Sequence, residues 1–249
     1  MTTPPEYIDV DGRNIAYRHR DGDGPGIVFL GGFASDMLGT KAEFLDDYCA
    51  DRGLAYLRLD YSGHGESSGD FTDGTIGTWA ADAQAVFDQV TKGPQIIVGS
   101  SMGGWIATLL ARARPDRLAG FVGIAAAPDF TEDLMWADFD DDIKRQIMED
   151  GVYLEPSEYS DEPTPVTRGL IEDGRNQLVL RSPLPITVPV RLIQGMQDPE
   201  VPWETAIRLA NHIDGPDVDV LLRKSGDHRL SEPDDLDILA RVLDSIRAQ

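Results

Sequence analysis

A short glycine-rich turn between an apolar run and a helix-like run constrains this chain more than any other feature. The apolar run 95–98 leads into the sequence Gly-Ser-Ser-Met-Gly at 99–103, and a helix-like run follows at 105–114. A Gly-x-Ser-x-Gly sequence in this strand, turn and helix context predicts a sharp elbow that exposes its central serine. Side chains in place of the two glycines would crowd the strand and the helix, in a turn that strains the serine backbone. Ser101 is therefore our candidate nucleophile.

A serine hydroxyl becomes a nucleophile only beside a base, and the base needs a group that orients it. Both kinds of residue occur downstream. The strand-like run 190–195 precedes a turn that contains Asp198, and the strand-like run 217–223 precedes a turn that contains His228. The order Ser, Asp, His is one of those known for catalytic triads. The other histidines lie in a polar strand, a glycine-rich loop and the end of a surface helix, at His19, His64 and His212.

These three residues predict acyl transfer by nucleophilic catalysis. His228 would take the proton of Ser101 as the serine attacks an acyl carbonyl, and Asp198 would fix the imidazole tautomer and stabilise the imidazolium. Asp227 is the rival acid. It adjoins the histidine in sequence, so it is poorly placed to meet the imidazole from across the strand ends.

An oxyanion forms in such a reaction and needs preorganised N–H donors. The residue after the nucleophile usually supplies one of them, which is here the backbone N–H of Met102. The apolar strand-like run 26–30 enters a Gly-Gly-Phe turn. The backbone N–H of Phe33 is therefore the predicted second donor.

Strand-like and helix-like segments alternate along most of the chain. An antiparallel hairpin is expected at 7–10 and 14–18, and the alternation that follows predicts an α/β fold with a mostly parallel central sheet and helices on both faces. The alternation stops after residue 128 and resumes at 188. We therefore predict a core of residues 1–128 and 185–249, with a helical cap inserted at 129–184 above the carboxyl ends of the strands.

The cap contains one predicted helix, at 134–148, with apolar residues at helical spacing and acidic residues on the other face. Its apolar face either packs on the core or, in part, lines a pocket for an acyl chain, with Met135 and Phe139 as candidate contacts. Trp203, beside the turn of Asp198, is a further candidate substrate contact, although a tryptophan there also suits core packing.

Composition excludes several classes of function. The formal charge of −22 disfavours nucleic acid and anionic membranes as partners. The chain has no 18-residue apolar run, and its first residues are neither basic nor apolar, so neither a membrane span nor a secretion signal is expected. No cluster has metal-ligand spacing, and no metal or cofactor is predicted. Cys49 is the one cysteine, which fits a reducing cytoplasm.

At this point the motifs add up to a family resemblance. The chain resembles the α/β-hydrolase superfamily, and within it the mitochondrial acyl-protein thioesterases of animals, which also act as acyl-glucuronide esterases. The matching segments are 39–42, 58–63, 93–105, 182–185, 195–198, 201–203, 217–220 and 223–229. The resemblance implies Ser101, Asp198 and His228 as a triad, and an acyl ester or thioester, protein-linked or small, as substrate.

The chain also departs from that pattern. It lacks a recognisable mitochondrial transit sequence, so we expect a cytoplasmic enzyme of bacterial type. Gly31 stands where many α/β-hydrolases have a histidine before the oxyanion glycine, and the cap is the segment that matches least.

Two other classes of function use the same fold and triad. One is a ligand receptor with little turnover. The other comprises cofactor-free perhydrolases and C–C bond hydrolases.

Overall fold

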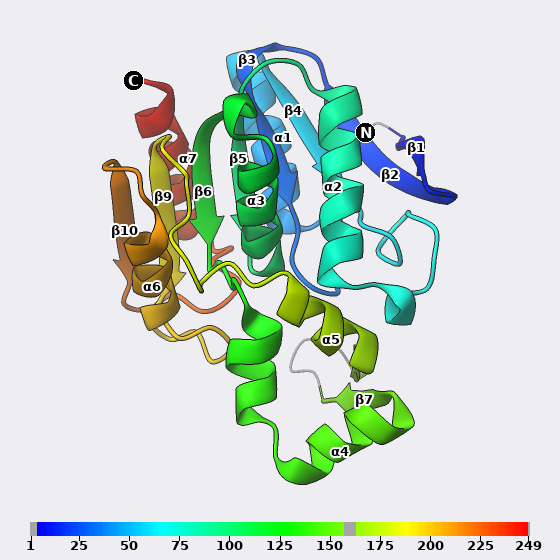
Figure 1. The fold of residues 1–249 in the computed structure, drawn as a ribbon. Coiled ribbons are helices and arrows are strands. Elements are labelled where there is room, and N and C mark those ends of the chain that lie inside the picture. Colours follow the sequence, from blue (N-terminus) through cyan, green and yellow to red (C-terminus); the bar gives the residue numbers. More distant parts are fainter. Residues whose placement is uncertain (1–3, 157–162, 249) are drawn as a thin grey trace.

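The computed structural model describes residues 4–156 and 163–248, and its centre is a twisted, mostly parallel sheet (Figure 1). Within these residues eight strands follow the order β1-β2-β4-β3-β5-β6-β9-β10. Only the pairs β1-β2 and β2-β4 are antiparallel; the others run parallel. The strands are β1 (Glu6–Val10), β2 (Arg13–Arg20), β3 (Asp23–Leu30), β4 (Leu54–Leu59), β5 (Gln95–Ser100), β6 (Leu118–Ile124), β9 (Val190–Gly195) and β10 (Val218–Arg223). The predicted opening hairpin and the predicted fold class are confirmed.

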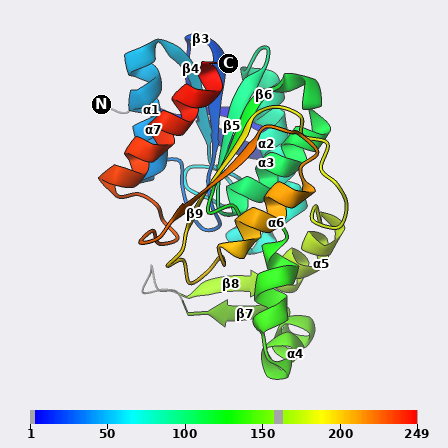
Figure 2. The ribbon, with the colours of Figure 1, turned by 90° about the vertical axis from the view of Figure 1, so that its left-hand side faces the viewer.

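The two faces of the sheet bury separate apolar clusters, because successive side chains of a strand point to opposite faces. In β3, for example, Ile27 and Phe29 belong to one cluster, and Val28 and Leu30 belong to the other. Helices α1 and α7 cover the first face, and α2, α3 and α6 cover the second (Figure 2). Their bounds are α1 (Thr40–Arg52), α2 (Ile76–Val90), α3 (Met102–Ala113), α6 (Glu204–His212) and α7 (Pro233–Arg247), with short 3-10 turns η1 (Phe71–Asp73) and η2 (Pro115–Arg117).

The segment after β6 leaves the sheet at the carboxyl ends of the parallel strands and forms a separate layer there (Figure 1). We call residues 129–184 the cap segment. Its elements are the π-helix η3 (Thr131–Trp136), α4 (Asp141–Asp150), the antiparallel strands β7 (Val152–Glu155) and β8 (Thr164–Thr167), and α5 (Arg168–Asn176).

The prediction of one continuous helix at 134–148 is wrong. The chain forms η3, bends, and starts α4 at Asp141. The side chain of Asp140 accepts the backbone N–H groups of Asp142 and Ile143, which satisfies donors that would otherwise be unpaired at a new helix start. The helical spacing of apolar residues continues through the bend, so periodicity alone did not reveal the break.

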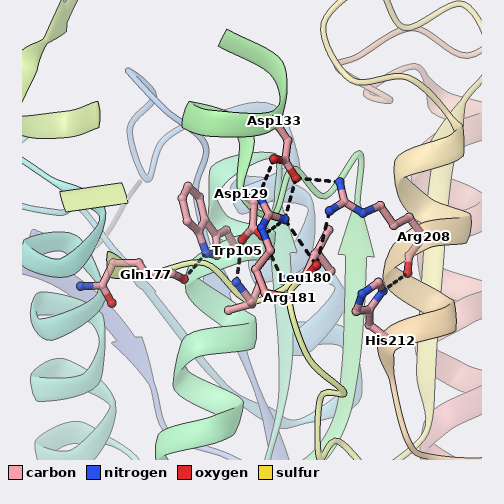
Figure 3. Close-up of polar contacts among 9 residues, drawn as sticks. Trp105, Asp129, Asp133, Gln177, Leu180, Arg181, Arg208 and His212 are labelled. Carbon is pink, nitrogen blue, oxygen red and sulfur yellow. Dashed lines mark hydrogen bonds and ion pairs between the residues drawn. The ribbon is translucent and has the colours of Figure 1, made fainter. Parts of the chain in front are cut away.

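A buried carboxylate joins the two ends of the cap segment (Figure 3). The side chain of Asp129 is 0% exposed. It accepts the backbone N–H groups of Val179 and Leu180 at 2.7 and 2.9 Å. It also pairs at 3.1 Å with Arg181, which reaches Asp133 as well. The entry and the exit of the cap segment are therefore fastened at one point.

Arg208 of α6 extends this network to the core. Its guanidinium lies 2.6 Å from Asp133 and also donates to the backbone carbonyl of Leu180 (Figure 3). Two guanidinium groups around Asp133 hold the pKa of that carboxyl below its usual range, although partial burial works against them.

Replacing Asp129 with Asn should destabilise the protein by about 1–3 kcal/mol, because an amide NH₂ would face a buried backbone N–H and leave it without an acceptor. Urea unfolding of the purified variant measures this. The matched control is Asp138→Asn, which changes an exposed acid of the same segment. Equal unfolding midpoints for the two variants would contradict the role given to Asp129.

Candidate active site

The turn between β5 and α3 holds Ser101 in a strained conformation. The residue has φ 53° and ψ −120°, in the region that favours glycine. Its backbone N–H donates to the carbonyl of Ile124 in β6 at 2.9 Å. A Cβ atom at Gly103 would lie 2.0 Å from the carbonyl oxygen of Leu30, and one at Gly99 would lie 2.4 Å from the carbonyl oxygen of Gly103. The flanking positions therefore require glycine, because strand and helix meet there without room for a side chain.

Three residues predicted from separate parts of the sequence meet at the carboxyl edge of the sheet. His228 Nδ1 lies 2.8 Å from Asp198 Oδ2, and His228 Nε2 lies 3.1 Å from Ser101 Oγ. An ionised carboxylate only accepts hydrogen bonds, so Nδ1 is the donor toward Asp198 and Nε2 can accept the serine proton. The ring thus connects acid and hydroxyl in the geometry that a base needs to activate a nucleophile.

Asp198 is held by groups that sequence patterns did not single out. Its side chain is 0% exposed, and its Oδ1 accepts the backbone N–H groups of Glu200 and Val201, each at 2.9 Å. Gln194, at the end of β9, donates from Nε2 to Asp198 Oδ2 at 2.9 Å. These contacts fix the carboxylate that faces the histidine. Gln194 and Asp198 are four positions apart in the sequence, on either side of a turn, so only the folded chain brings their side chains together.

Asp227 has a different task from Asp198. Its Oδ1 accepts the backbone N–H of Leu230 at 2.9 Å, which closes the turn that carries His228. Lys41 of α1 supports the same loop, since its Nζ donates to the backbone carbonyl of Arg229 and to Ser231 Oγ. Burial lowers the pKa of Lys41 to about 8, and the nearby charge of Asp227 acts in the opposite direction. Lys41 lies in one of the segments that carried the family resemblance.

The loop after β3 lies beside the elbow, as expected for the second oxyanion donor. A Cβ atom at Gly32 would lie 3.4 Å from Ser101 Cβ, so the backbone that leads to Phe33 passes next to the serine. Phe33 is half-buried, and its ring contacts the rings of Phe71, Trp79 and Phe130, with centroids 5.0 to 5.9 Å away. Met102 opens α3 and is fully buried.

His64 supports the loop after β3. The sequence indicated only that this histidine lies in a glycine-rich loop of its own. Its Nδ1 donates to the carbonyl of Ser62 at 3.2 Å, so its Nε2 is an acceptor, and the backbone N–H of Ala34 donates to it at 3.3 Å. Ala34 has φ 53°, and this hydrogen bond helps hold its strained backbone. Burial lowers the pKa of His64, and its bond to Ser62 works the other way. The neutral ring that burial favours is the form that can accept from Ala34.

The three candidate substrate contacts lie in different surroundings. Phe139 is buried in the apolar cluster that the cap segment shares with α2, α3 and α6, and its ring meets that of Tyr153 edge to face at 5.7 Å. Met135 is half-buried and packs against the same cluster. Trp203, half-buried, is the residue before α6. Phe139 is thus chiefly a packing residue here.

Residues 4–156 and 163–248 contain no group of three or more His, Cys, Asp or Glu side chains that could hold a metal ion. None of the helices in these ranges is long and apolar enough to cross a membrane.

Comparison with known proteins gives consistent matches. A family model described as alpha/beta hydrolase fold matches residues 25–168. The mitochondrial palmitoyl-protein thioesterase ABHD10 of Bos taurus is 39% identical over 234 residues, which cover 94% of this chain and 76% of that protein. The structure of alpha/beta hydrolase domain-containing protein 10 from mouse superposes with a TM-score of 0.92 at 36% identity and covers 99% of both chains. A putative hydrolase from Agrobacterium vitis S4 has a TM-score of 0.93 and 41% identity, with 98% of this chain and 99% of that one covered.

These matches correct one prediction. A cytoplasmic location was expected from the single cysteine and from the first residues, but the thioesterases of Bos taurus, Mus musculus and Homo sapiens are named as mitochondrial proteins. The expectation of a cytoplasmic enzyme is therefore contradicted. Cysteine content distinguishes oxidising from reducing compartments, and it does not distinguish one reducing compartment from another.

The family model spans more than half of the chain, and the relatives match along nearly all of it. The predicted fold, the predicted resemblance and the predicted class of enzyme are confirmed. The chain belongs to the α/β-hydrolase fold family, in the branch of the palmitoyl-protein thioesterases, and it is a hydrolase of ester or thioester bonds.

Proposed function

We propose that Ser101, His228 and Asp198 form the catalytic triad of a serine hydrolase. The observation that carries the proposal is the imidazole of His228, which lies 2.8 Å from Asp198 Oδ2 and 3.1 Å from Ser101 Oγ. Ser101 Oγ attacks the acyl carbonyl carbon while its proton moves to His228 Nε2. Asp198 keeps the ring in the required tautomer and stabilises the imidazolium.

The tetrahedral intermediate then collapses. Its bond to the leaving sulfur or oxygen breaks, the leaving group takes the proton from His228 where it needs one, and an acyl-serine remains. Water repeats the sequence, with His228 again as the base, and releases a carboxylic acid and free Ser101. The backbone N–H groups of Phe33 and Met102 stabilise the oxyanion in both halves of the cycle.

The substrate is an acyl thioester or oxygen ester, carried by a protein or a small molecule. The relatives named palmitoyl-protein thioesterases support the thioester, with a long acyl chain, as the first substrate to test. In this proposal residues 129–184 are the cap over the site. Met135 and Trp203 are candidate contacts for the acyl chain, with Phe139 as support for the cap interior.

Ser101→Ala should abolish labelling by a fluorophosphonate, because the probe reacts only with an activated serine. Intact-protein mass spectrometry of wild type and variant after incubation gives the readout. A single adduct on the wild type that is absent from the variant is expected. A folded wild type that takes up no adduct would overturn the proposed triad.

The triad acid is tested by a matched pair of variants. Asp198→Asn should lower kcat by about 10⁴-fold, as loss of the acid does in other triads, because the ring is then held in the wrong tautomer. Asp227→Asn changes a neighbouring acid whose Oδ1 accepts the backbone N–H of Leu230 and does not orient the imidazole in this proposal, so its effect on kcat should be far smaller. Steady-state hydrolysis of a short acyl ester measures both. The reverse order of effects would reassign the acid.

His64→Phe should slow acylation by about 10- to 100-fold, because Ala34 loses its acceptor and the loop that presents the Phe33 N–H loosens. His64→Gln is the matched control, since its Oε1 can take the place of Nε2 as an acceptor. The second-order rate of fluorophosphonate labelling measures the effect, with thermal melting to verify that both variants fold. Equal rates for the two folded variants would exclude this role of His64.

A further inference from the structure

A second carboxylate lies beside the proposed catalytic histidine, and the triad does not use it. Glu200 Oε2 lies 3.3 Å from His228 Nε2, the nitrogen that also faces Ser101 Oγ. Glu200 belongs to the turn of Asp198, and its backbone N–H is bound to Asp198 Oδ1. Its side chain is 44% exposed.

The position of Glu200 suits only one protonation state of the ring. With Nδ1 donating to Asp198, the neutral imidazole presents a lone pair at Nε2. Ser101 can share that lone pair because its hydroxyl brings a proton, whereas the ionised carboxylate of Glu200 brings none. Once Nε2 has taken the serine proton, the same carboxylate faces a positive N–H at ion-pair distance. Glu200 is therefore complementary to the imidazolium that forms during acyl transfer.

The charged groups around this contact come from four parts of the fold: the turn after β9, the histidine loop, α1 and β7. Asp198 and Glu200 face the ring from the turn after β9. Asp227 and Lys41 lie around the loop of the histidine. Burial, together with the negative charge of Glu200, raises the pKa of Glu155 in β7 of the cap segment. Among these groups, Glu200 lies 3.3 Å from Nε2, and Asp198 meets the ring at Nδ1.

A stabilised imidazolium affects the two proton transfers of acylation differently. Proton removal from Ser101 becomes easier for every substrate. Protonation of the leaving group becomes harder, because the proton on Nε2 is held by Glu200. An alcohol is about as weak an acid as water, so its alkoxide requires that proton in order to leave. A thiol has a pKa of about 8.5, so it departs as a thiolate without it.

We propose that Glu200 is a specificity-determining residue that favours thioesters over oxygen esters by holding the proton on His228 Nε2. The proposal rests on the proposed function, since it needs Ser101 as nucleophile and His228 as base. Glu200 contacts neither acyl group nor nucleophile in this role. It acts on the reaction through the histidine.

The test uses two neutral substrates that differ in one atom: the S-butyryl thioester of N-acetylcysteamine and the O-butyryl ester of N-acetylethanolamine. Both give the same acyl-enzyme, so kcat/KM isolates the acylation step in which the leaving group departs. In Glu200→Gln the ratio of thioester to ester kcat/KM should fall by about tenfold. This is the lower end of the effect that an opposite charge at this distance has on a pKa, and the lower end applies because Glu200 is partly exposed.

Glu232→Gln is the matched control, because it removes one negative charge from an exposed position at the N-terminus of α7. Its ratio should equal that of the wild type. A merely structural role of Glu200 would lower kcat/KM for both substrates together and leave the ratio unchanged. That result, or a wild-type ratio in a folded Glu200→Gln protein, would overturn the proposal.

Fluorophosphonate labelling of Ser101 is run on the same preparations. It separates failure of this proposal from failure of the proposed function. Labelled Ser101 with an unchanged ratio refutes the role of Glu200 alone. Absence of labelling and of hydrolysis in the wild type refutes the triad, and the role of Glu200 with it.

Discussion

The close packing of β5, α3 and β3 at a single turn is the constraint on which the candidate site depends. The carbonyl oxygen of Leu30 lies where a side chain at Gly103 would begin, so α3 can start this close to the sheet only without one. The same contact places the loop after β3 beside Ser101. A strained serine and the neighbouring N–H groups of the loop are therefore products of one packing arrangement. A strained backbone persists only where the surrounding structure holds it in place. Here the hydrogen bond from the Ser101 N–H to the carbonyl of Ile124 in β6 contributes to this.

A buried carboxylate organises the other half of the site. Asp198 receives two backbone N–H groups and the amide of Gln194, and it still has Oδ2 available to His228. Burying an ionised group is costly unless hydrogen bonds replace its hydration, and here they do. Because the bonds come from its own turn and from the end of β9, the position of the imidazole is linked to the rigid sheet. Lys41 and Asp227 hold the histidine loop from the other side.

The cap segment is fastened to this core by a second buried carboxylate, Asp129. Its bonds to Val179 and Leu180 bring the two ends of the cap segment together where β6 ends. Arg181, Asp133 and Arg208 continue the network to α6 (Figure 3). Burial and the negative charge of Glu200 together raise the pKa of Glu155 in the cap segment, so cap and histidine turn are coupled electrostatically. The surroundings of the proposed catalytic histidine are thus shaped by the cap as well as by the core.

Local patterns in the chain were sufficient for the sheet and its helices. The bounds of β9 follow from the strand-like run 190–195. The elbow follows from glycines at positions where strand and helix leave no room for a side chain. They also identified Ser101, Asp198 and His228 as candidates, because parallel strands end at the same edge of a sheet. They failed in the cap, where the capping side chain of Asp140 ends a run that periodicity continued.

The parts that only the tertiary structure decided are those that depend on contacts between distant segments. His64 and Ala34 are thirty residues apart, and nothing in the sequence near either one indicates that the imidazole accepts the backbone N–H of Ala34 in the loop after β3. Glu200 is close to Asp198 in sequence, but its importance comes from His228, which β10 brings to the same edge. The sequence by itself determined the order of elements and the chemistry of the candidate residues, because both arise from local spacing. The tertiary structure decided which side chains hold those residues and which charge faces the histidine, because these follow from how the chain packs.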